Sequence, residues 1–158
     1  MDKILSVDNL NVSFNTRGTI ITAVNNLSFH LQKNEVLGIV GESGSGKSQT
    51  VLSLMGLLES NGGATGSAVF KNKEILGLSD KELNKIRGNE IAMIFQDPMS
   101  SLNPYITIGE QMSGVLRQHS KDNKKEARNR CIEMLSAVKV PSPDKRIDGY
   151  SFELSGGM

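Results

Sequence analysis

Two extended runs, with apolar residues set between polar ones, open the chain. Their sequences are KILSVDNLNVSF and TIITAVNNLSFHL, and NTRG separates them. Asn, Gly and small polar residues are typical of the turn between two strands. The pattern therefore predicts an antiparallel β-hairpin at the start of the chain.

Two short apolar runs further along predict buried strands. They are EVLGIV, residues 35–40, and IAMIF, residues 91–95. The first leads directly into the glycine-rich segment GESGSGKS, and the QTVLSLMGLL that follows predicts a helix to about Leu58. The predicted order is strand, glycine loop, helix.

The segment between these strands contains loop and capping signals. ESNGGATGS, residues 59–67, predicts a loop on its composition. Ser79, with Glu82 three residues later, is a candidate capping box for a short helix that extends through Arg87.

Two amphipathic helices are predicted beyond Gln96, where the strand signals end. Apolar residues recur on one helical face in ITIGEQMSGVLRQHS and again in DNKKEARNRCIEMLSAVKV. The predicted core positions are Ile108, Met112, Val115, Leu116, Ala127, Cys131, Met134, Leu135 and Val138. VPSPDKR, with two prolines, predicts a loop after the second helix.

Composition narrows the functional classes only slightly. The chain has 158 residues, 18 Lys and Arg against 17 Asp and Glu, and a net charge of +1. This balance gives no electrostatic reason to expect a nucleic-acid partner. The single Cys131 cannot form an intramolecular disulfide, and no stretch approaches 18 apolar residues.

The glycine-rich segment carries the first chemical signal. Residues 41–48 fit the phosphate-loop pattern of Gly, four residues, Gly, Lys and then Ser or Thr. Glycines let backbone N–H groups surround a polyphosphate, Lys47 would reach the β and γ phosphates, and Ser48 would bind Mg²⁺. A flexible turn is the alternative, but the preceding apolar run and the following helical one favour nucleotide binding. The predicted ATP-binding residues here are Gly41, Glu42, Ser43, Gly44, Ser45, Gly46, Lys47, Ser48 and Gln49.

Three sequence segments distinguish among the families of phosphate-loop proteins. They are VNNLSFHLQKNEVLGIVGESGSGKS, IAMIFQDPMSSLNPYITIGEQM and SFELSGGM. In order and spacing they resemble the ATP-binding cassette (ABC) ATPases, and LSGGM resembles the signature variant of the oligopeptide and dipeptide importer branch. An α/β phosphate-loop fold is implied, with a mixed β sheet and the start of a helical subdomain.

The resemblance implies further site residues. Phe14 falls where the family places an aromatic ring that stacks on adenine, although an ordinary strand residue is nearly as good an interpretation. Gln96 is similar to the glutamine that touches the Mg²⁺ and attacking-water region, so Gln96 and Lys47 are the predicted catalytic residues. The predicted signature residues, which would contact ATP on a second ATPase subunit, are Leu154, Ser155, Gly156 and Gly157.

The resemblance also implies what would follow the signature. In this family the chain continues to a Mg²⁺-coordinating Asp, a catalytic Glu and a switch His, so we expect that this chain ends within a domain and hydrolyses ATP poorly. Without a neighbouring strand, residues 36–40 would be an unpaired apolar edge that favours self-association.

Two alternatives remain at this point. One is a self-contained small kinase or GTPase that uses Asp97, after IAMIFQ, to bind Mg²⁺. The other is a non-transport ABC ATPase of DNA repair, against which the near-neutral charge and FQDPMSSLNP argue.

The favoured interpretation is the N-terminal part of an ABC importer ATPase subunit that couples ATP and Mg²⁺ to uptake of peptides or a related solute. Residues 1–95 would form the nucleotide-binding core, and residues 96–158 the Q-loop, helical subdomain and signature. Expected partners are transmembrane permease subunits, a second ATPase subunit and, indirectly, an extracytoplasmic solute-binding protein, with no nucleic acid. The expected location is the cytoplasmic face of the cell membrane.

Overall fold

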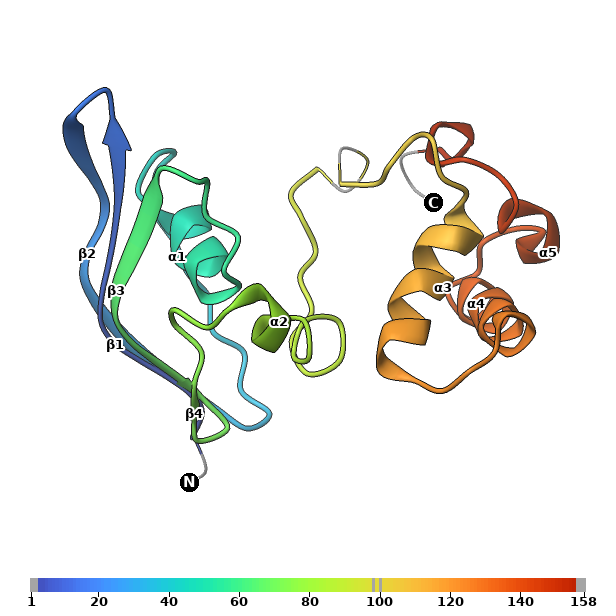
Figure 1. Cartoon of the computed structure of the whole chain (residues 1–158), viewed down its shortest axis with the longest axis horizontal. Coiled ribbons are helices and arrows are strands. Elements are labelled where there is room, and N and C mark those ends of the chain that lie inside the picture. The colour runs from blue at the N-terminus through green and yellow to red at the C-terminus, as the bar shows by residue number, and fades with distance from the viewer. Residues whose placement is uncertain (1–2, 98, 100, 156–158) are drawn as a thin grey trace. The chain divides into compact units, whose positions relative to one another are not determined.

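The computed structural model describes residues 3–97, 99 and 101–155. The chain folds as two compact units, Met1–Arg87 and Gly88–Met158 (Figure 1). Each unit is described by itself. The functional division expected between residues 95 and 96 rests on the family resemblance and stays an expectation.

The predicted hairpin is confirmed. Strand β1 (Lys3–Thr16) pairs antiparallel with β2 (Thr19–Gln32), from Lys3 opposite Gln32 to Thr16 opposite Thr19. Both turn residues have positive φ, 51° at Arg17 and 85° at Gly18. This geometry matches the right-handed twist of the strands and explains why a two-residue turn suffices.

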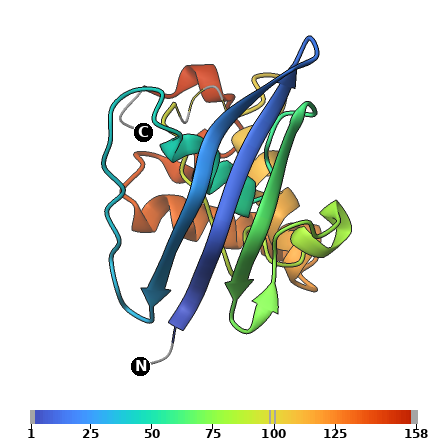
Figure 2. The ribbon, with the colours of Figure 1, turned by 90° about the vertical axis from the view of Figure 1, so that its left-hand side faces the viewer.

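The hairpin belongs to a four-stranded sheet with strand order β2-β1-β3-β4, shown face-on in Figure 2. Strand β3 (Gly62–Phe70) pairs with β1, and β4 (Lys73–Glu74) pairs with β3. Every described pair is antiparallel. The expected α/β class is therefore confirmed, whereas the sheet within the described residues is antiparallel and not mixed.

The loop predicted over residues 59–67 is wrong, because most of it belongs to β3. Two of its glycines, Gly62 and Gly66, are required by packing against β1. A Cβ on Gly62 would lie 2.6 Å from the Phe14 ring, and one on Gly66, where φ is 113°, would lie 2.5 Å from the Asn9 carbonyl oxygen. Close approach to β1 thus outweighs the low strand propensity of glycine.

The two predicted buried strands are also wrong. Residues 35–40 and 92–95 lie in no strand, and Val36, Val40 and Ile94 are 96%, 95% and 92% exposed. A buried strand requires neighbours that accept its backbone hydrogen bonds and cover its side chains. Among the described residues, only Ile91 of the two runs lies in a β-bridge, and its carbonyl oxygen accepts the Gly88 N–H at 2.9 Å.

Helix α1 (Lys47–Leu54) lies against one face of the sheet (Figure 1). Beneath it, Val7, Leu10 and Val12 of β1 are fully buried. The helix is shorter than predicted, because Gly56 (φ 62°) ends it. Helix α2 (Asp80–Leu83) follows, with the predicted capping box of Ser79 and Glu82, although it too is shorter than expected.

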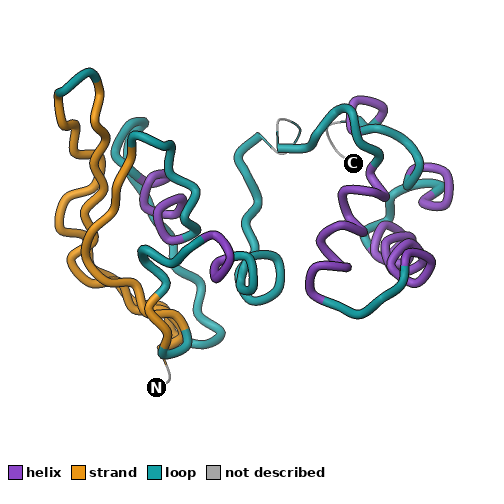
Figure 3. The backbone as a smooth tube through the Cα atoms, viewed as in Figure 1, coloured by secondary structure: helices purple, strands orange, loops and turns teal. Residues whose placement is uncertain are grey.

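The second unit consists of helices and loops (Figure 3). Helices α3 (Ile108–His119) and α4 (Lys124–Ala137) confirm the two amphipathic predictions. Ile108, Ala127, Cys131 and Ile147 form its core. Three predicted core residues are instead exposed, at 50% for Val115, 52% for Met134 and 71% for Val138.

The end of this unit contains two short elements that the sequence did not predict. Helix α5 (Pro143–Arg146) replaces part of the predicted loop, because a proline at the first helical position costs no hydrogen bond. The 3₁₀ turn η1 (Ser151–Glu153) leads to Leu154. None of the helices in the described part of the chain is long and apolar enough to cross a membrane.

Candidate nucleotide-binding site

The phosphate loop reaches α1 through a glycine that no other residue can replace without strain. Gly46 is the N-cap of α1 with φ 88°. A Cβ there would lie 2.3 Å from the Ala23 carbonyl oxygen and 3.2 Å from Cγ2 of Val24 on β2. The start of the helix thus rests on the β-hairpin, and its first-turn N–H groups carry no side-chain cap. Free N–H groups at the positive end of a helix dipole suit an anion.

Lys47 closes the loop from the other side. Its Nζ donates to the carbonyl oxygens of Gly41 at 2.7 Å and Glu42 at 2.6 Å, and to Oγ of Ser45 at 3.3 Å. A Cβ on Gly41 would lie 2.6 Å from Ser45 Oγ and 3.9 Å from Lys47 Cδ, so this glycine makes room for the contact. The ammonium group is held at the loop, where it can serve an anionic ligand.

The first turn of α1 also offers the predicted magnesium ligand. Ser48 is exposed, Gln49 is half-buried, and Thr50 turns inward to donate from Oγ1 to the Gly46 carbonyl oxygen at 3.0 Å. Mg²⁺ in nucleotide sites takes one or two protein oxygens and completes its shell with phosphate and water. An exposed hydroxyl beside free N–H groups fits that requirement, and no three-residue acidic, His or Cys cluster occurs among residues that the structure describes.

Phe14 lies on the same sheet face as the phosphate loop. It is two residues from Val12, which pairs with Val24, so all three side chains point to the side that carries Gly46. Its ring is half-buried and rests on Gly62 of β3. Part of the aromatic face is therefore accessible, and the adenine-stacking role stays a prediction.

The other predicted site residues lie in the second unit. Gln96 is exposed in a bend, and the Asp97 carboxylate accepts the Met99 N–H at 3.2 Å. Leu154 is half-buried after η1 and Ser155 is exposed, whereas Gly156 and Gly157 lie outside the described residues. The structure places Phe14 on the sheet face that carries the loop. The roles of the loop residues, Phe14, Gln96 and the signature stay predictions.

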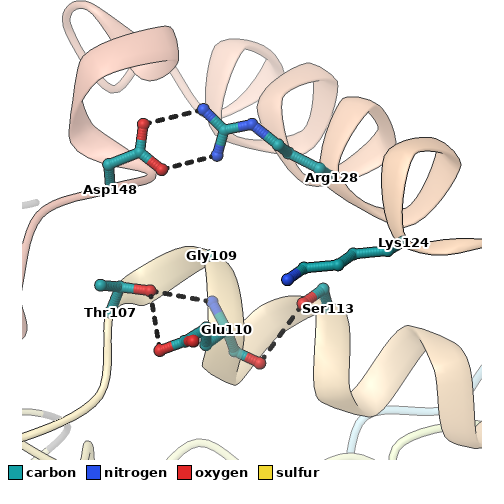
Figure 4. Close-up of a pocket in the computed structure, with 7 residues that line it drawn as sticks. All are labelled: Thr107, Gly109, Glu110, Ser113, Lys124, Arg128 and Asp148. Atoms are coloured by element: carbon teal, nitrogen blue, oxygen red, sulfur yellow. Dashed lines mark hydrogen bonds and ion pairs between the residues drawn. The ribbon is translucent and has the colours of Figure 1, made fainter.

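A pocket of about 360 Å³, lined mainly by polar and charged residues, lies between α3 and α4 (Figure 4). Arg128 and Asp148 form a two-bond ion pair across its rim at 2.7 and 2.8 Å. Lys124 and Glu110 add one charge of each sign to the lining. With its charges balanced, the pocket shows no preference for an anionic or cationic ligand.

Two contacts that hold the loop and α1 were not predicted from the sequence. Ala23 and Val24 form the surface on which Gly46 rests, and Arg87 binds the far end of α1. No short-range signal identifies either contact, because both join residues more than twenty positions apart along the chain.

Comparison with known proteins gives the family. The model of the ABC transporter family matches residues 24–158. The chain is 54% identical over 158 residues to the oligopeptide transport ATP-binding protein OppD of Haemophilus influenzae, covering 100% of this chain and 49% of that protein. It is 50% identical over 160 residues to the dipeptide transport ATP-binding protein DppD of Bacillus subtilis, covering 100% of this chain and 48% of that protein. The chain thus spans about half the length of these curated relatives.

Solved structures agree. The ATP-binding cassette MJ0796, in a dimeric post-hydrolysis state with ADP and Pi, aligns with a TM-score of 0.78 at 25% identity, over 97% of this chain and 64% of that one. CbiO1 of Clostridium perfringens, part of an ABC transporter complex, aligns with a TM-score of 0.66 at 27% identity, over 99% of this chain and 57% of that one. The small kinase or GTPase alternative does not account for a family match that includes Asp97. The chain belongs to the ABC transporter family.

Proposed function

We propose that this chain is the ATP-binding part of an ABC importer ATPase subunit that drives the uptake of peptides. The observation that carries the proposal is the loop of residues 41–48, which ends at a helix start without a side-chain cap and holds the Lys47 ammonium group against its own backbone. Relatives named as oligopeptide and dipeptide transport ATP-binding proteins support peptides as the transported solute, and favour transport over DNA repair.

The proposed roles divide the nucleotide between loop and sheet. The N–H groups before and within the first turn of α1 bind the phosphates, and Lys47 neutralises their charge. Ser48 supplies a hydroxyl oxygen to Mg²⁺, which when bound screens the phosphate charge and orients the phosphates. Phe14 stacks on the adenine from the same face of the sheet.

The second unit would connect the nucleotide to its partners. Apolar side chains are exposed on both sides of Gln96, with Phe95 at 40% and Tyr105 at 90%. Exposed aromatic residues favour a protein interface. In the proposal this segment and α3 contact the transmembrane permease subunits at the cytoplasmic face of the membrane, and the solute-binding protein acts on the other side.

Hydrolysis would require two ATPase subunits. The segment from Leu154 to Gly157 would meet the γ-phosphate of ATP held by the partner subunit, with Gln96 near the attacking water. The similarity to a dimeric cassette bound to ADP and Pi supports this arrangement. Closing around ATP and reopening after hydrolysis would then move the permease.

The test is the affinity for ATP, ADP and AMP, measured by calorimetry, of the wild-type chain and of Lys47→Ala. If Lys47 binds the β and γ phosphates, its removal should weaken ATP and ADP at least tenfold, corresponding to about 1.4 kcal/mol, and leave AMP nearly unchanged. The control is Lys33→Ala, an exposed lysine of the same unit. Equal ATP affinity of the wild-type and Lys47→Ala chains would refute the phosphate role.

A further inference from the structure

The far end of the phosphate-loop helix is bound by an arginine from a distant part of the sequence. Arg87 Nε and Nη2 both donate to the Met55 carbonyl oxygen, at 2.9 and 2.6 Å. Nη2 also donates to the Gly56 carbonyl oxygen at 2.9 Å. Although charged, the Arg87 side chain is only 20% exposed.

The backbone at this end is shaped to receive the guanidinium group. Leu57 N–H donates to the Leu52 carbonyl at 2.8 Å and Gly56 N–H to the Ser53 carbonyl at 3.1 Å, the two bonds of a Schellman motif. A Cβ on Gly56 would lie 2.9 Å from Arg87 Nη2 and 2.4 Å from Leu83 Cδ1. The motif leaves the Met55 and Gly56 carbonyls pointing outward, and Arg87 takes both.

A second set of bonds orients the guanidinium from α2. Its Nη1 donates to Asp80 Oδ1 and to Asn84 Oδ1, each at 3.1 Å. The group is therefore fixed on two sides, and Leu83 and Ile86 of the same segment are buried. Arg87 thus couples α2 rigidly to the negative end of the α1 dipole.

Helix α1 needs such an anchor because its own packing is weak. It has eight residues, and within it only Thr50 and Ser53, both polar, are buried. Isolated helices of this length are unstable in water, so contacts made by other parts of the chain must hold it. One end rests on the hairpin at Gly46, and the Arg87 contacts hold the other.

We propose that Arg87 is a positioning residue of the nucleotide site, which holds α1 at its C-terminal end so that Lys47 and Ser48 face the phosphates. The predicted effect of Arg87 on ATP affinity rests on the proposed function, whereas its predicted effect on the stability of α1 does not. Only six residues of α1 follow Ser48. Because the helix is so short, loss of the Arg87 contacts would tilt or unwind all of it, including its first turn.

The experiment compares the full chain with Arg87→Met and Arg87→Lys. Amide hydrogen exchange without nucleotide should show at least tenfold lower protection at Thr50 to Leu54 in Arg87→Met, with the β1 and β3 amides unchanged. Mg-ATP affinity should fall at least fivefold. Arg87→Lys, which keeps the charge and can reach one carbonyl, should give intermediate values for both.

The control is Lys81→Met, which removes a positive charge from the exposed side of α2 and should match the wild type. Equal loss of protection in the sheet and α1, or unchanged protection in α1, would overturn the proposal. If Arg87→Met does not fold, the amide exchange of α1 and the Mg-ATP affinity of Arg87→Lys test the proposal instead. If the wild type binds no ATP, the proposed function fails, whereas the nucleotide-free exchange data still decide the role of Arg87.

Discussion

Single residues of the phosphate loop are fixed by contacts that can be tested one at a time. Gly46→Ala combines two penalties, a left-handed backbone at φ 88° and a Cβ 2.3 Å from the Ala23 carbonyl oxygen. We expect a loss of about 3 kcal/mol in unfolding free energy from strain and overpacking together. ATP binding should fall at least tenfold, as measured by denaturation and calorimetry.

The matched control for that substitution is Gly18→Ala. Gly18 has nearly the same φ, 85°, but nothing lies within 4 Å of a Cβ built on it. It should therefore lose only roughly 1–2 kcal/mol from the backbone and retain ATP affinity. If the two variants lose equal stability and equal affinity, Gly46 matters for its backbone conformation alone.

Glu74 predicts a pH dependence of the first unit. Burial raises the pKa of its carboxyl, but hydrogen bonds from Ser67 Oγ and the N–H groups of Ala68, Leu76 and Ile75 outweigh burial and lower the pKa below its ordinary 4.5. The contribution of Glu74 to stability is then complete above pH 4.5 and is lost as the pH falls through the lower folded pKa.

The measurement is the unfolding free energy of the wild type and Glu74→Gln between pH 7 and pH 3. The difference should be less than about 1 kcal/mol at pH 7, since the residue is exposed, and should shrink toward pH 3. Ser67→Ala should remove part of the same difference. A difference that is constant or grows on acidification would contradict this role.

At the scale of helices and strands, local patterns were sufficient where a segment carries its own signal. The β1–β2 hairpin, α3 and α4 follow from turn residues and helical spacing. Strand β3 does not, because Gly62 and Gly66 are required by close contacts with Phe14 and Asn9 on another strand. The phosphate loop was predictable from glycine spacing, whereas the Arg87 contact spans 32 positions and has no local pattern.

The apolar runs that were wrongly predicted as buried strands carry a local signal but lack partners in the structure. EVLGIV and IAMIF have a buried-strand composition, but a strand forms only with neighbouring strands. The described residues provide no more than a single bridge at Ile91. Similarly, Met134 and Val138 have helical core spacing, yet lie on the side of α4 that no described element covers. Composition indicates which segments would gain stability from burial. Whether they are buried depends on the presence of neighbouring strands or helices.

Helix α4 contains a reporter of the second core. Cys131 is fully buried, and burial raises the pKa of its thiol more than the neighbouring Arg130 charge lowers it. The thiol should therefore not react with a disulfide reagent in the folded chain, and should react as denaturant unfolds the second unit.

The reaction of Cys131 with the disulfide reagent is followed by absorbance during a denaturant titration, and unfolding is followed by circular dichroism on the same samples. A Ser136→Cys variant adds an exposed thiol on the same helix and should label at once with one equivalent. Labelling of the native wild type at the speed of that exposed thiol would show that α4 does not pack as described.

At the scale of the whole molecule, the residues proposed to bind the chain's own ATP, and the residue proposed to position them, lie in one unit. The phosphate loop, Phe14 and Arg87 all belong to Met1–Arg87, whereas Gln96, the signature and the exposed aromatic segment belong to Gly88–Met158. In the proposal, the first unit binds ATP, and the second unit acts on the attacking water, on the ATP of the partner subunit and on the permease.

The most direct test is amide hydrogen exchange of the 158-residue chain with and without Mg-ATP. We predict that Mg-ATP slows exchange at residues 41–50, and less strongly around Phe14, while α4 is unchanged. Omission of Mg²⁺ should reduce the protection, because Ser48 is proposed to bind this ion. Absence of protection at residues 41–50 under saturating Mg-ATP, or protection confined to other segments, would contradict the assignment of this loop as the ATP site.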